Sequence, residues 1–459
     1  MNDTSRTDNI MTPRERRATW GLGAVFSLRM LGMFMVLPVL TTYGMALQGA
    51  SESLIGVAIG IYGLMQALFQ VPFGLLSDRV GRKPLIVIGL LMFVLGSVIA
   101  ALSTNIWGII LGRALQGAGA ISAAVMALLS DLTREQNRTK AMAFIGISFG
   151  VTFAIAMVLG PIVAHAWGLQ SLFWCMALLA SLGIVITLTL IPNAANHALN
   201  RESAIVRGSI RQVLSNSRLV KLNVGIMCLH ILLMSSFVAL PRVLEQAGLP
   251  AEAHWKVYLY TMLISFIGVL PFIIYAEVKR QMKRVFVGCI VVLLAAEVVL
   301  WMAGSQFWPI VAGIQLFFLA FNIMEALLPS LISKEAPAGY KGTAMGVYST
   351  TQFIGVAIGG SMGGALFQFH GAAWVFAAGA LLCALWLIVG VSMKEPPYLS
   401  SLRITLPDEA LDDSALAQKI RIHPGVAEAI VVPEERSAYV KIDRQKTSRQ
   451  QLEALIGQA

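Results

Sequence analysis

The chain has 459 residues, of which 57% are hydrophobic and only 13% are charged, whereas an ordinary soluble protein has about 25% charged residues. This composition excludes a disordered chain, a coiled coil and a secreted disulfide scaffold, and it disfavours a soluble enzyme of this size. The net charge of +10 would suit a nucleic-acid-binding protein, but the distribution of the basic residues along the chain predicts no nucleic-acid partner.

Twelve apolar stretches of the sequence are long enough to cross a bilayer as helices. They cover residues 20–42, 53–76, 84–102, 106–130, 140–164, 171–192, 221–241, 256–276, 285–303, 306–333, 343–366 and 372–393. Gly, Pro and polar residues interrupt many of them, which membrane helices tolerate when neighbouring helices satisfy the backbone. The sequence therefore predicts an all-α polytopic membrane protein with twelve transmembrane helices.

The basic residues indicate how these helices cross the membrane. If the N-terminus is cytoplasmic, 22 of the 26 lysines and arginines up to residue 394 lie on the cytoplasmic side. Arg242 and Lys256 then lie on the opposite side, and Arg29 and Arg113 lie inside the helices. This asymmetry follows the positive-inside rule, so we expect the N- and C-termini in the cytoplasm.

The sequence repeats weakly, because the segment 128–131 resembles the segment 331–334 at an offset of 203 residues. Repeats of this kind are typical of transporters built from two similar halves around a central binding site. We therefore expect a six-helix half in residues 1–192, a cytoplasmic linker at 193–220 and a second six-helix half in 221–394.

From residue 395 to residue 459 the sequence is typical of a small cytoplasmic domain. Strands are expected at 401–406, 426–432 and 438–442, and helices at 409–421 and 447–456. The order β-α-β-β-α predicts a ferredoxin-like α+β domain without a fourth strand. Metal-binding domains of this type use a Cys-x-x-Cys loop, but this segment contains no cysteine, so a regulatory ligand or partner is the favoured role.

A charged motif connects the second and third apolar stretches. It reads Gly74-Leu-Leu-Ser-Asp78-Arg79-Val-Gly81-Arg82-Lys83-Pro84. The motif resembles the signature loop of the major facilitator superfamily. A generic basic loop is the alternative, and the spacing of the carboxylate, the glycines and the basic pair disfavours that alternative.

The resemblance implies a contact that holds the two halves together on the cytoplasmic side. Asp78 would lie at the N-terminus of the eleventh helix, which begins near Gly342, and a carboxylate is favoured there by about 0.3–1 kcal/mol. Arg82 would pair with Asp131 at the end of the fourth helix. The residues assigned to this contact are Gly74, Asp78, Gly81, Arg82 and Asp131.

Two further motifs resemble those of the superfamily, the first its general second motif and the second the antiporter motif of its drug-exporting branch. The fourth helix carries Arg113-Ala-Leu-Gln116-Gly-Ala-Gly119, and the fifth carries Gly146, Gly150 and Gly160-Pro161. The fifth helix departs from the antiporter motif at Ala164-His165, where a Gly-Gly pair is usual. The resemblance implies a proton-coupled efflux transporter of the bacterial inner membrane, which moves a small amphipathic molecule by rocker-switch alternating access.

Other functions stay open from the sequence alone. A uniporter or importer of a small solute is one alternative, and a transporter-fold sensor that signals through the C-terminal domain is another. An enzyme is not expected, because we recognise no nucleophile–base set and no metal-ligand cluster, and no cofactor or metal is expected either. The four cysteines stand alone in apolar stretches: Cys175, Cys228, Cys289 and Cys383.

Charged side chains inside the predicted helices are candidates for the transport pathway, because each costs about 2.5–3.5 kcal/mol to insert at a helix centre. Glu325 is predicted to carry the proton, since Asn322 lies one turn before it on the same face of the helix. Arg29 and Arg113 are predicted to modulate it. The alternative is that Glu325 is a fixed counter-ion to one of these arginines.

Two more polar residues of the predicted helices have open roles. His230, in the seventh helix, either relays protons or is a hydrogen-bonded core histidine. Glu297, in the ninth helix, has apolar neighbours and could lie near the lipid interface.

Overall fold

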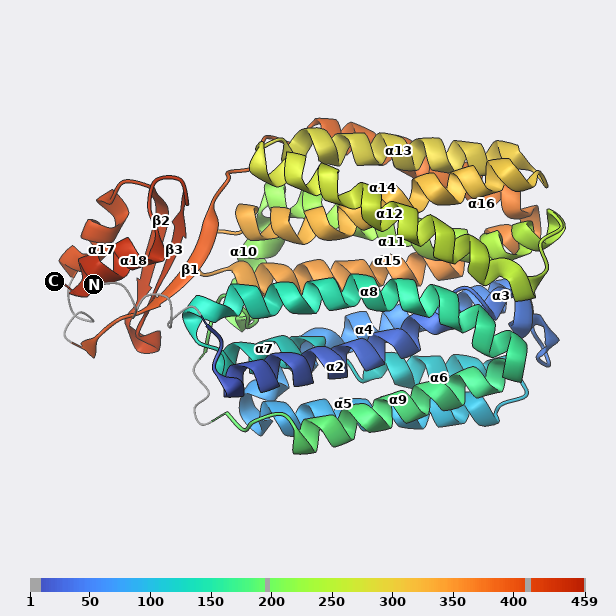
Figure 1. The fold of residues 1–459 in the computed structure, drawn as a ribbon, viewed down its shortest axis with the longest axis horizontal. Coiled ribbons are helices and arrows are strands. Elements are labelled where there is room, and N and C mark those ends of the chain that lie inside the picture. The colour runs from blue at the N-terminus through green and yellow to red at the C-terminus, as the bar shows by residue number, and fades with distance from the viewer. Residues whose placement is uncertain (1–9, 195–198, 409–413, 458–459) are drawn as a thin grey trace.

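The computed structural model describes residues 10–194, 199–408 and 414–457. Figure 1 shows a long bundle of helices with a small domain of strands and helices attached at one end. We call that end of the bundle the domain end and the opposite one the far end.

The first half of the bundle follows the predicted stretches closely. Its helices are α2 (Pro13–Met35), α3 (Leu40–Tyr43), α4 (Glu52–Val80), α5 (Arg82–Leu102), α6 (Ile106–Ala118), α7 (Ser122–Leu132), α8 (Glu135–Trp167) and α9 (Leu169–Thr189). Helices α6 and α7 together occupy the predicted fourth span.

The second half begins after the short helix α10 (Ile210–Ser215). Its helices are α11 (Ser217–Gln246), α12 (His254–Val278), α13 (Met282–Ala303), α14 (Phe307–Glu335), α15 (Lys341–His370) and α16 (Ala372–Val391). Within the described residues, eleven helical spans are long and apolar enough to cross a membrane. Helix α15 is the twelfth long span: its 30 residues are rich in glycine, and it packs inside the bundle against α4 and α11. The predicted twelve-helix architecture is confirmed.

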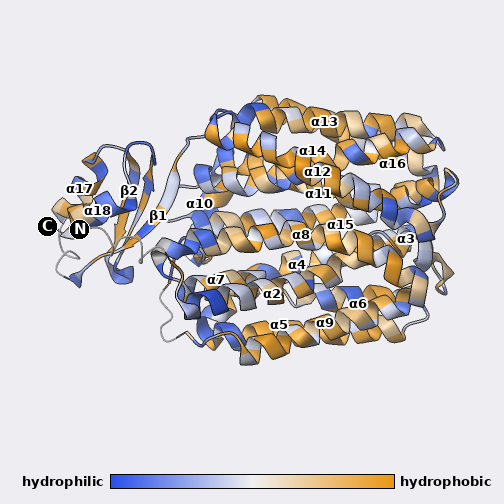
Figure 2. Ribbon diagram, viewed as in Figure 1, coloured by the Kyte–Doolittle hydropathy of each residue, from blue (hydrophilic) through white to orange (hydrophobic). Residues whose placement is uncertain are grey.

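The surface of the bundle is suited to lipid. Figure 2 shows hydrophobic residues along the sides of the helices and hydrophilic residues gathered at the two ends and in the C-terminal domain. Large apolar side chains are exposed, among them Leu95, Ile267 and Leu381, at 54%, 75% and 63%. Soluble monomers rarely expose apolar surface on this scale, so we expect the sides of the bundle to face the hydrocarbon of a bilayer.

Glycines bring α4 and α15 into backbone contact near the far end. A Cβ atom on Gly56 would lie 2.3 Å from the carbonyl oxygen of Gly360, and one on Gly360 would lie 2.7 Å from the amide nitrogen of Gly60. Small residues allow helices to approach this closely in membranes. Arg242 also reaches Glu52 at 3.3 Å, so the two halves are in direct contact at the far end.

The fourth span is broken between α6 and α7. At the break, a Cβ atom on Gly119 would lie 2.2 Å from the carbonyl oxygen of Gly89 on α5. The close approach of the two backbones requires glycine, and irregular backbone is tolerated within a membrane where protein buries it. The sequence predicts one continuous helix here, so the break is a difference from that prediction.

The C-terminal domain has strands β1 (Ser400–Thr405), β2 (Val426–Val432) and β3 (Ser437–Ile442), and helices α17 (Ser414–Ile422) and α18 (Arg449–Gly457). The sheet order is β1-β3-β2, with β3 antiparallel to both neighbours. A central strand between two strands joined by a helical crossover is the ferredoxin-like split βαβ arrangement, as predicted. Residues 409–413 of the predicted first helix lie outside the described residues.

The domain is held against the domain end of the bundle by polar contacts. Lys441 Nζ, on β3, donates hydrogen bonds to the carbonyl oxygens of Lys334 and of Ala336, the latter at 2.6 Å, where α14 ends. Burial lowers the pKa of Lys441 to about 8, and the carbonyls of a helix C-terminus favour a positive charge. Arg280, after α12, pairs with Asp443 at 3.0 Å.

Candidate functional site

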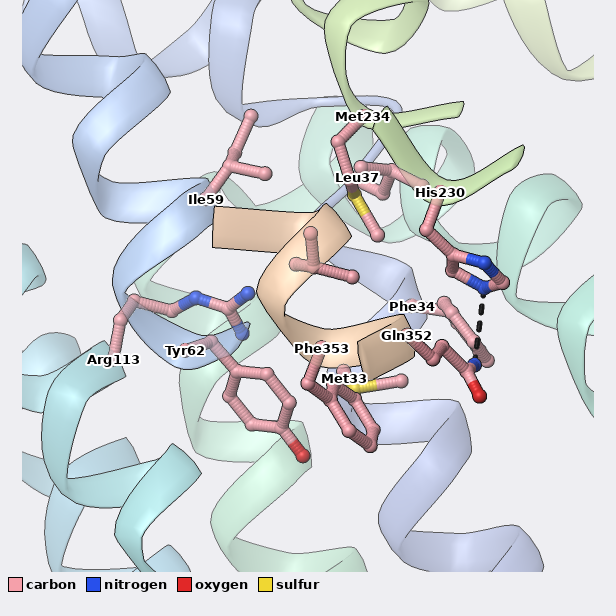
Figure 3. A pocket seen from close by; sticks show the side chains of 11 residues that line it. Met33, Phe34, Leu37, Ile59, Tyr62, Arg113, His230, Met234, Gln352 and Phe353 are labelled. Carbon is pink, nitrogen blue, oxygen red and sulfur yellow. Dashed lines mark hydrogen bonds between the residues drawn. The ribbon is translucent and has the colours of Figure 1, made fainter. Parts of the chain in front are cut away.

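A narrow cavity lies between the two halves, beside the middle of α11 and α15 (Figure 3). It is lined by Met33, Phe34, Leu37, Ile59, Tyr62, Arg113, His230, Met234, Gln352, Phe353 and Val356. The lining is mostly apolar, and its polar groups come from both halves. The cavity is much smaller than an ordinary ligand pocket in this conformation, and its lining would suit the apolar part of a small molecule once the halves move apart.

His230 is the central polar residue on the cavity wall that the second half of the chain provides. Its Nδ1 lies 3.2 Å from the carbonyl oxygen of Ile226, and its Nε2 lies 3.0 Å from the amide nitrogen of Gln352. A carbonyl oxygen only accepts hydrogen bonds, so we assign the proton to Nδ1. Nε2 then accepts from the Gln352 amide, and this pattern describes a neutral imidazole.

Glu325, on α14, lies next to this histidine. Its Oε1 is 3.5 Å from His230 Nε2 and has no hydrogen-bond partner within the described residues. The side chain is 17% exposed, whereas that of His230 is 3% exposed. Because their atoms are 3.5 Å apart, the two groups are close enough to exchange a proton after a small movement or through a water molecule.

Asn322 does not bond to Glu325, although it is on the same helix. Its amide donates to the carbonyl oxygen of Phe318 at 2.8 Å and lies 3.6 Å from the sulfur of Met262 on α12. It is 8% exposed. The amide thus ties α14 to α12 in this conformation.

Arg29 and Arg113 form a buried network in the first half. Arg29 Nη2 donates to Gln66 Oε1 at 3.0 Å and to the carbonyl oxygen of Gln116 at 3.4 Å. Arg113 Nη1 donates to Gln116 Oε1 at 3.1 Å. Both guanidinium groups also lie over the ring of Tyr62, whose π-electrons attract a cation. The Cζ atoms of Arg29 and Arg113 are 5.9 Å and 4.7 Å, respectively, from the ring centroid.

Neither arginine is within 4.0 Å of a carboxylate in the part of the chain that the structure describes. Glu297 and Glu325 both belong to the second half. The buried carboxylates of the first half, Glu15 and Asp131, pair with other arginines. Positive charge is therefore buried in one half and the candidate proton carrier in the other. In this conformation Glu325 is not the counter-ion of Arg29 or Arg113.

The expectation that Glu297 lies near the lipid interface is wrong. The residue is 1% exposed and accepts a hydrogen bond from Ser236 Oγ at 3.0 Å. A Cβ atom on Gly379 of α16 would lie 2.6 Å from its carboxylate. Glu297 is thus enclosed between α11, α13 and α16, because the orientation of α13 about its own axis points this side chain toward the interior of the bundle.

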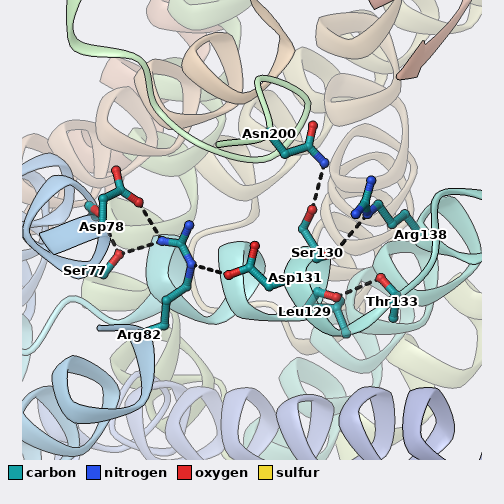
Figure 4. Close-up of polar contacts among 10 residues, drawn as sticks. Ser77, Asp78, Arg82, Leu129, Ser130, Asp131, Thr133, Arg138 and Asn200 are labelled. Atoms are coloured by element: carbon teal, nitrogen blue, oxygen red, sulfur yellow. Dashed lines mark hydrogen bonds and ion pairs between the residues drawn. The ribbon is translucent and has the colours of Figure 1, made fainter. Parts of the chain in front are cut away.

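Arg82 is the centre of the signature-loop cluster (Figure 4). Its Nη1 pairs with Asp78 Oδ1 and its Nε pairs with Asp131 Oδ2, both at 2.7 Å. Ser77 Oγ accepts a third bond at 3.0 Å. Gly81, at φ +107°, makes the turn from α4 to α5 in a conformation that favours glycine.

Gly74, the remaining predicted member, contributes through its size. A Cβ atom there would lie 3.0 Å from the Cβ of Ala123 on α7, so glycine lets α4 approach α7. The cluster thus connects the ends of α4 and α7 with the start of α5, all within the first half.

The predicted contact between Asp78 and the start of the eleventh helix is replaced by a different one. Gly342, in the first turn of α15, donates its N–H to the carbonyl oxygen of Arg201 at 2.8 Å, and Thr343 Oγ1 accepts from the N–H of Val206 at 3.0 Å. Residues 200–206 of the linker therefore occupy the start of α15. We call them the linker segment.

Sequence reasoning missed the linker segment and the partners of the buried charges. Ala204 and Ile205 are 5% and 8% exposed, and this apolar pair within a polar linker is a signal that the sequence contains. Gln116 stands inside the second motif and joins the two arginines. In the described residues, no three His, Cys, Asp or Glu side chains are placed to hold a metal ion.

Comparison with known proteins places the chain in a family. The sequence profile of the Major Facilitator Superfamily matches residues 22–360 and 283–424, and that of the YajR YAM domain matches residues 402–458. The chain is 68% identical to the inner membrane transport protein YajR of Escherichia coli (strain K12), over 98% of this chain and 100% of that protein. It is 41% identical to an uncharacterized transporter of Buchnera aphidicola subsp. Acyrthosiphon pisum, over 75% and 89%.

The fold agrees with these matches. The structure is similar to that of the nucleoside transporter NupG, with a TM-score of 0.66 over 82% of this chain and 99% of that one. The identity to NupG is 15%, so this similarity concerns the fold alone. From its profile matches, its relatives and its twelve-helix fold, the chain is a member of the major facilitator superfamily of membrane transporters.

Proposed function

We propose that this transporter exports a small amphipathic molecule in exchange for protons, by rocker-switch alternating access. The observation that carries the proposal is the pair Glu325–His230, which combines a partly buried carboxylate and a neutral imidazole 3.5 Å apart beside a cavity between the halves. An acid and a base at this separation can hold and pass one proton. The motif of the fifth helix supports antiport rather than uniport.

Protonation changes what the site can do during the cycle. An ionised Glu325 is costly to carry through a closed, dry intermediate, whereas a protonated one is neutral. Substrate and proton would therefore occupy the site alternately, each allowing the halves to rock. The far-end contacts of Gly56, Gly360 and Glu52 would break in the outward-open state.

We assign the domain end to the cytoplasm and the protein to the bacterial inner membrane. The clustering of lysine and arginine at the domain end supports this orientation, and the name of the E. coli relative supports the location. Both chain termini, and the ferredoxin-like domain with its regulatory ligand or partner, would then be cytoplasmic.

Transport into proteoliposomes that contain the protein in inside-out orientation, under an imposed pH gradient, tests the proposal. Export coupled to protons requires that substrate accumulation reverses its direction when the gradient is reversed. Uptake that follows the substrate gradient alone would identify a uniporter. If the protein moves no substrate but changes a cellular output, and this effect requires residues 400–459, the protein is a sensor.

Asp78→Asn is expected to abolish export and to leave folding largely intact. The substitution removes one of two carboxylates around Arg82, and Asp131 continues to pair with that arginine at 2.7 Å. Arg82 is 4% exposed and Asp78 is 32% exposed, and the arginine keeps Asp131 and Ser77 as partners, so the substitution leaves no unpaired buried charge. The measurement is the initial transport rate in liposomes together with the thermal unfolding midpoint in detergent.

The matched control for this variant is Asp408→Asn. Asp408 is 71% exposed and pairs with Arg436 in the C-terminal domain, so the same chemical change occurs outside the bundle. Its transport rate should equal that of the parent. A parental rate in Asp78→Asn itself would show that the cluster has no role in the cycle.

Lys441→Met is expected to weaken the docking of the C-terminal domain without loss of substrate binding. The methionine fills a similar volume but leaves the carbonyl oxygens of Lys334 and Ala336 unsatisfied, at a cost of about 1–3 kcal/mol. Amide hydrogen exchange in residues 426–442 should accelerate. Lys446→Met, at an exposed position, is the control and should change nothing.

The pH dependence of docking has a definite sign. Burial lowers the pKa of Lys441 to about 8 in the docked state. Undocking exposes its ammonium group to water, so we expect the docked state to bind fewer protons. Docking should therefore strengthen as the pH rises from about 8 to about 10.5. The dependence should be absent in Lys441→Met.

A further inference from the structure

We propose that the linker segment is an autoinhibitory wedge, and that the C-terminal domain sets the conformational equilibrium of the transporter by holding it in place. The inference concerns regulation and rests on the proposed alternating-access function. It follows from where the segment lies, what it displaces and which groups hold it.

The linker segment lies between the two halves at the domain end and bonds to both. On one side, Asn200 Nδ2 donates to Ser130 Oγ on α7 at 2.9 Å. On the other side, Gly342 and Thr343 of α15 bond to its backbone. The segment therefore joins the first half to the second at the end where the halves must close.

The packing of the segment is as close as that of a core element. A Cβ atom on Gly342 would lie 2.3 Å from the carbonyl oxygen of Ala204, and one on Gly346 would lie 2.6 Å from the Ile205 side chain. Ile205 also faces α4, because a Cβ atom on Gly74 would lie 3.7 Å from its Cδ1. The Ile205 side chain therefore lies between the two glycines of α4 and α15.

Direct closure of the domain end and the linker segment exclude each other. The N–H group of Gly342 is a donor that a carboxylate from the other half would need at the start of α15, and it is already bonded to the carbonyl oxygen of Arg201. The backbone of Val206 also lies against the Thr343 hydroxyl, whose oxygen accepts its N–H. For Asp78 to approach the start of α15, the segment must leave. The segment thus favours the conformation in which the far end is closed.

The C-terminal domain holds the other face of the segment. Arg201 Nε pairs with Glu435 at 2.8 Å, and the N–H of Arg201 donates to the hydroxyl of Tyr439 at 3.1 Å. Glu202 accepts a hydrogen bond from Ser401 Oγ at 2.6 Å. Arg201 and Glu435 are 22% and 10% exposed, so this ion pair is more sheltered than an ordinary surface pair.

Through these contacts, the C-terminal domain can regulate whether the linker segment stays between the two halves. Any ligand or partner that displaces the sheet from Arg201 and Glu202 removes three polar contacts from the wedge. The wedge is then held only by the bundle, and the population shifts toward closure at the domain end. A ligand that binds the docked domain has the opposite effect.

The test measures the separation of the halves at the domain end in the full chain. Spin labels at Val80→Cys on α4 and Lys279→Cys after α12 report the distance, in a background with Cys175→Ser. The release variant combines Arg201→Gln with Ser401→Ala, which removes the domain contacts and keeps the pairing of Glu202 with Lys341 of α15 at 3.9 Å. The control combines Arg207→Gln with Arg211→Gln, which lie in the same linker and have exposed side chains.

We expect the release variant to raise the ratio of the short-distance to the long-distance population by at least about threefold, which corresponds to roughly 0.6 kcal/mol or more, and the control to equal the parent. An unchanged ratio, or a shift toward longer distances, would overturn the proposal. Because the measurement uses neither substrate nor a proton gradient, it holds whether or not transport is proton-coupled.

A second variant keeps the test independent of domain folding. Val206→Cys combined with Thr343→Cys should allow a disulfide that fixes the segment to α15, since the two residues are already hydrogen-bonded at 3.0 Å. Oxidation should remove the short-distance population, and reduction should restore it. Persistence of that population after complete oxidation would contradict the wedge.

Discussion

Glu325→Gln is expected to stop proton-driven export and to preserve substrate binding. The amide has the size and polarity of the protonated carboxyl group but cannot release a proton. Proton-driven transport should fall to the background of empty liposomes, while counterflow exchange, which needs no net proton movement, should continue. The measurement is the number of protons released when substrate is added to lightly buffered protein in detergent.

Glu297→Gln is the matched control, because Glu297 is a second buried glutamate of the same half. It accepts a hydrogen bond from Ser236 and is enclosed by helices away from the cavity. This variant should release as many protons as the parent. Full proton release by Glu325→Gln would make Glu325 a structural residue and move the carrier elsewhere.

Gly360→Ala is expected to open the far end and to lower the stability of the protein. The added Cβ would lie 2.7 Å from the oxygen of Gly56 and 2.7 Å from the nitrogen of Gly60, and backbone atoms cannot move aside as a side chain can. Overpacking of this kind costs about 1–3 kcal/mol. Because the strain exists only when α4 and α15 touch, the outward-open state should gain population.

The measurement for Gly360→Ala is the reactivity of Met33→Cys, within the cavity, toward a thiol reagent added from the far end. Reactivity should rise severalfold, and the unfolding temperature should fall. Gly288→Ala on α13 is the control, since its Cβ would meet no atom within 4 Å. Equal reactivity in the two variants would show that the glycine contact does not restrain the far end.

The fold was predictable because it depends on local properties of the sequence. Apolar length decides whether a helix spans a bilayer, and the basic residues decide its direction. The C-terminal strands followed from alternation, so β2 and β3 were found to within one residue. Even α15, whose glycines lower its hydropathy, was recognised because its middle lacks charge. The break at Gly119 was missed, since it arises from contact with Gly89 on another helix.

The site was predictable only in part, because its partners come from distant segments. The high cost of charge within a helix drew attention to Glu325, Arg29 and Arg113. The hydrogen bond between His230 and Gln352 joins residues 122 positions apart, and no spacing rule predicts it. Glu297 was misplaced for a similar reason: its exposure depends on the rotation of α13, and an all-apolar helix has no polar face from which to infer that rotation.

The linker shows the limit of reasoning from composition. Four arginines made residues 193–220 look like a solvated connection, and most of them fit that description. Ala204 and Ile205 do not, because they are buried between the halves. Family resemblance pointed to a direct contact at the same place, so the sequence and the resemblance both omitted the element that the structure puts there.

The break between α6 and α7 has a mechanical consequence. Arg113 and Gln116 lie before the break, beside the cavity, whereas Ser130 and Asp131 lie after it, at the domain end. A continuous helix would transmit every tilt from one group to the other as a rigid rod. Because the helix is interrupted at residues 119–121, we expect the ion pairs of Arg82 to be able to rearrange with less displacement of the Arg113 guanidinium group than a continuous helix would allow. The broken span therefore separates the cavity wall at Arg113 from the Arg82 cluster at the domain end.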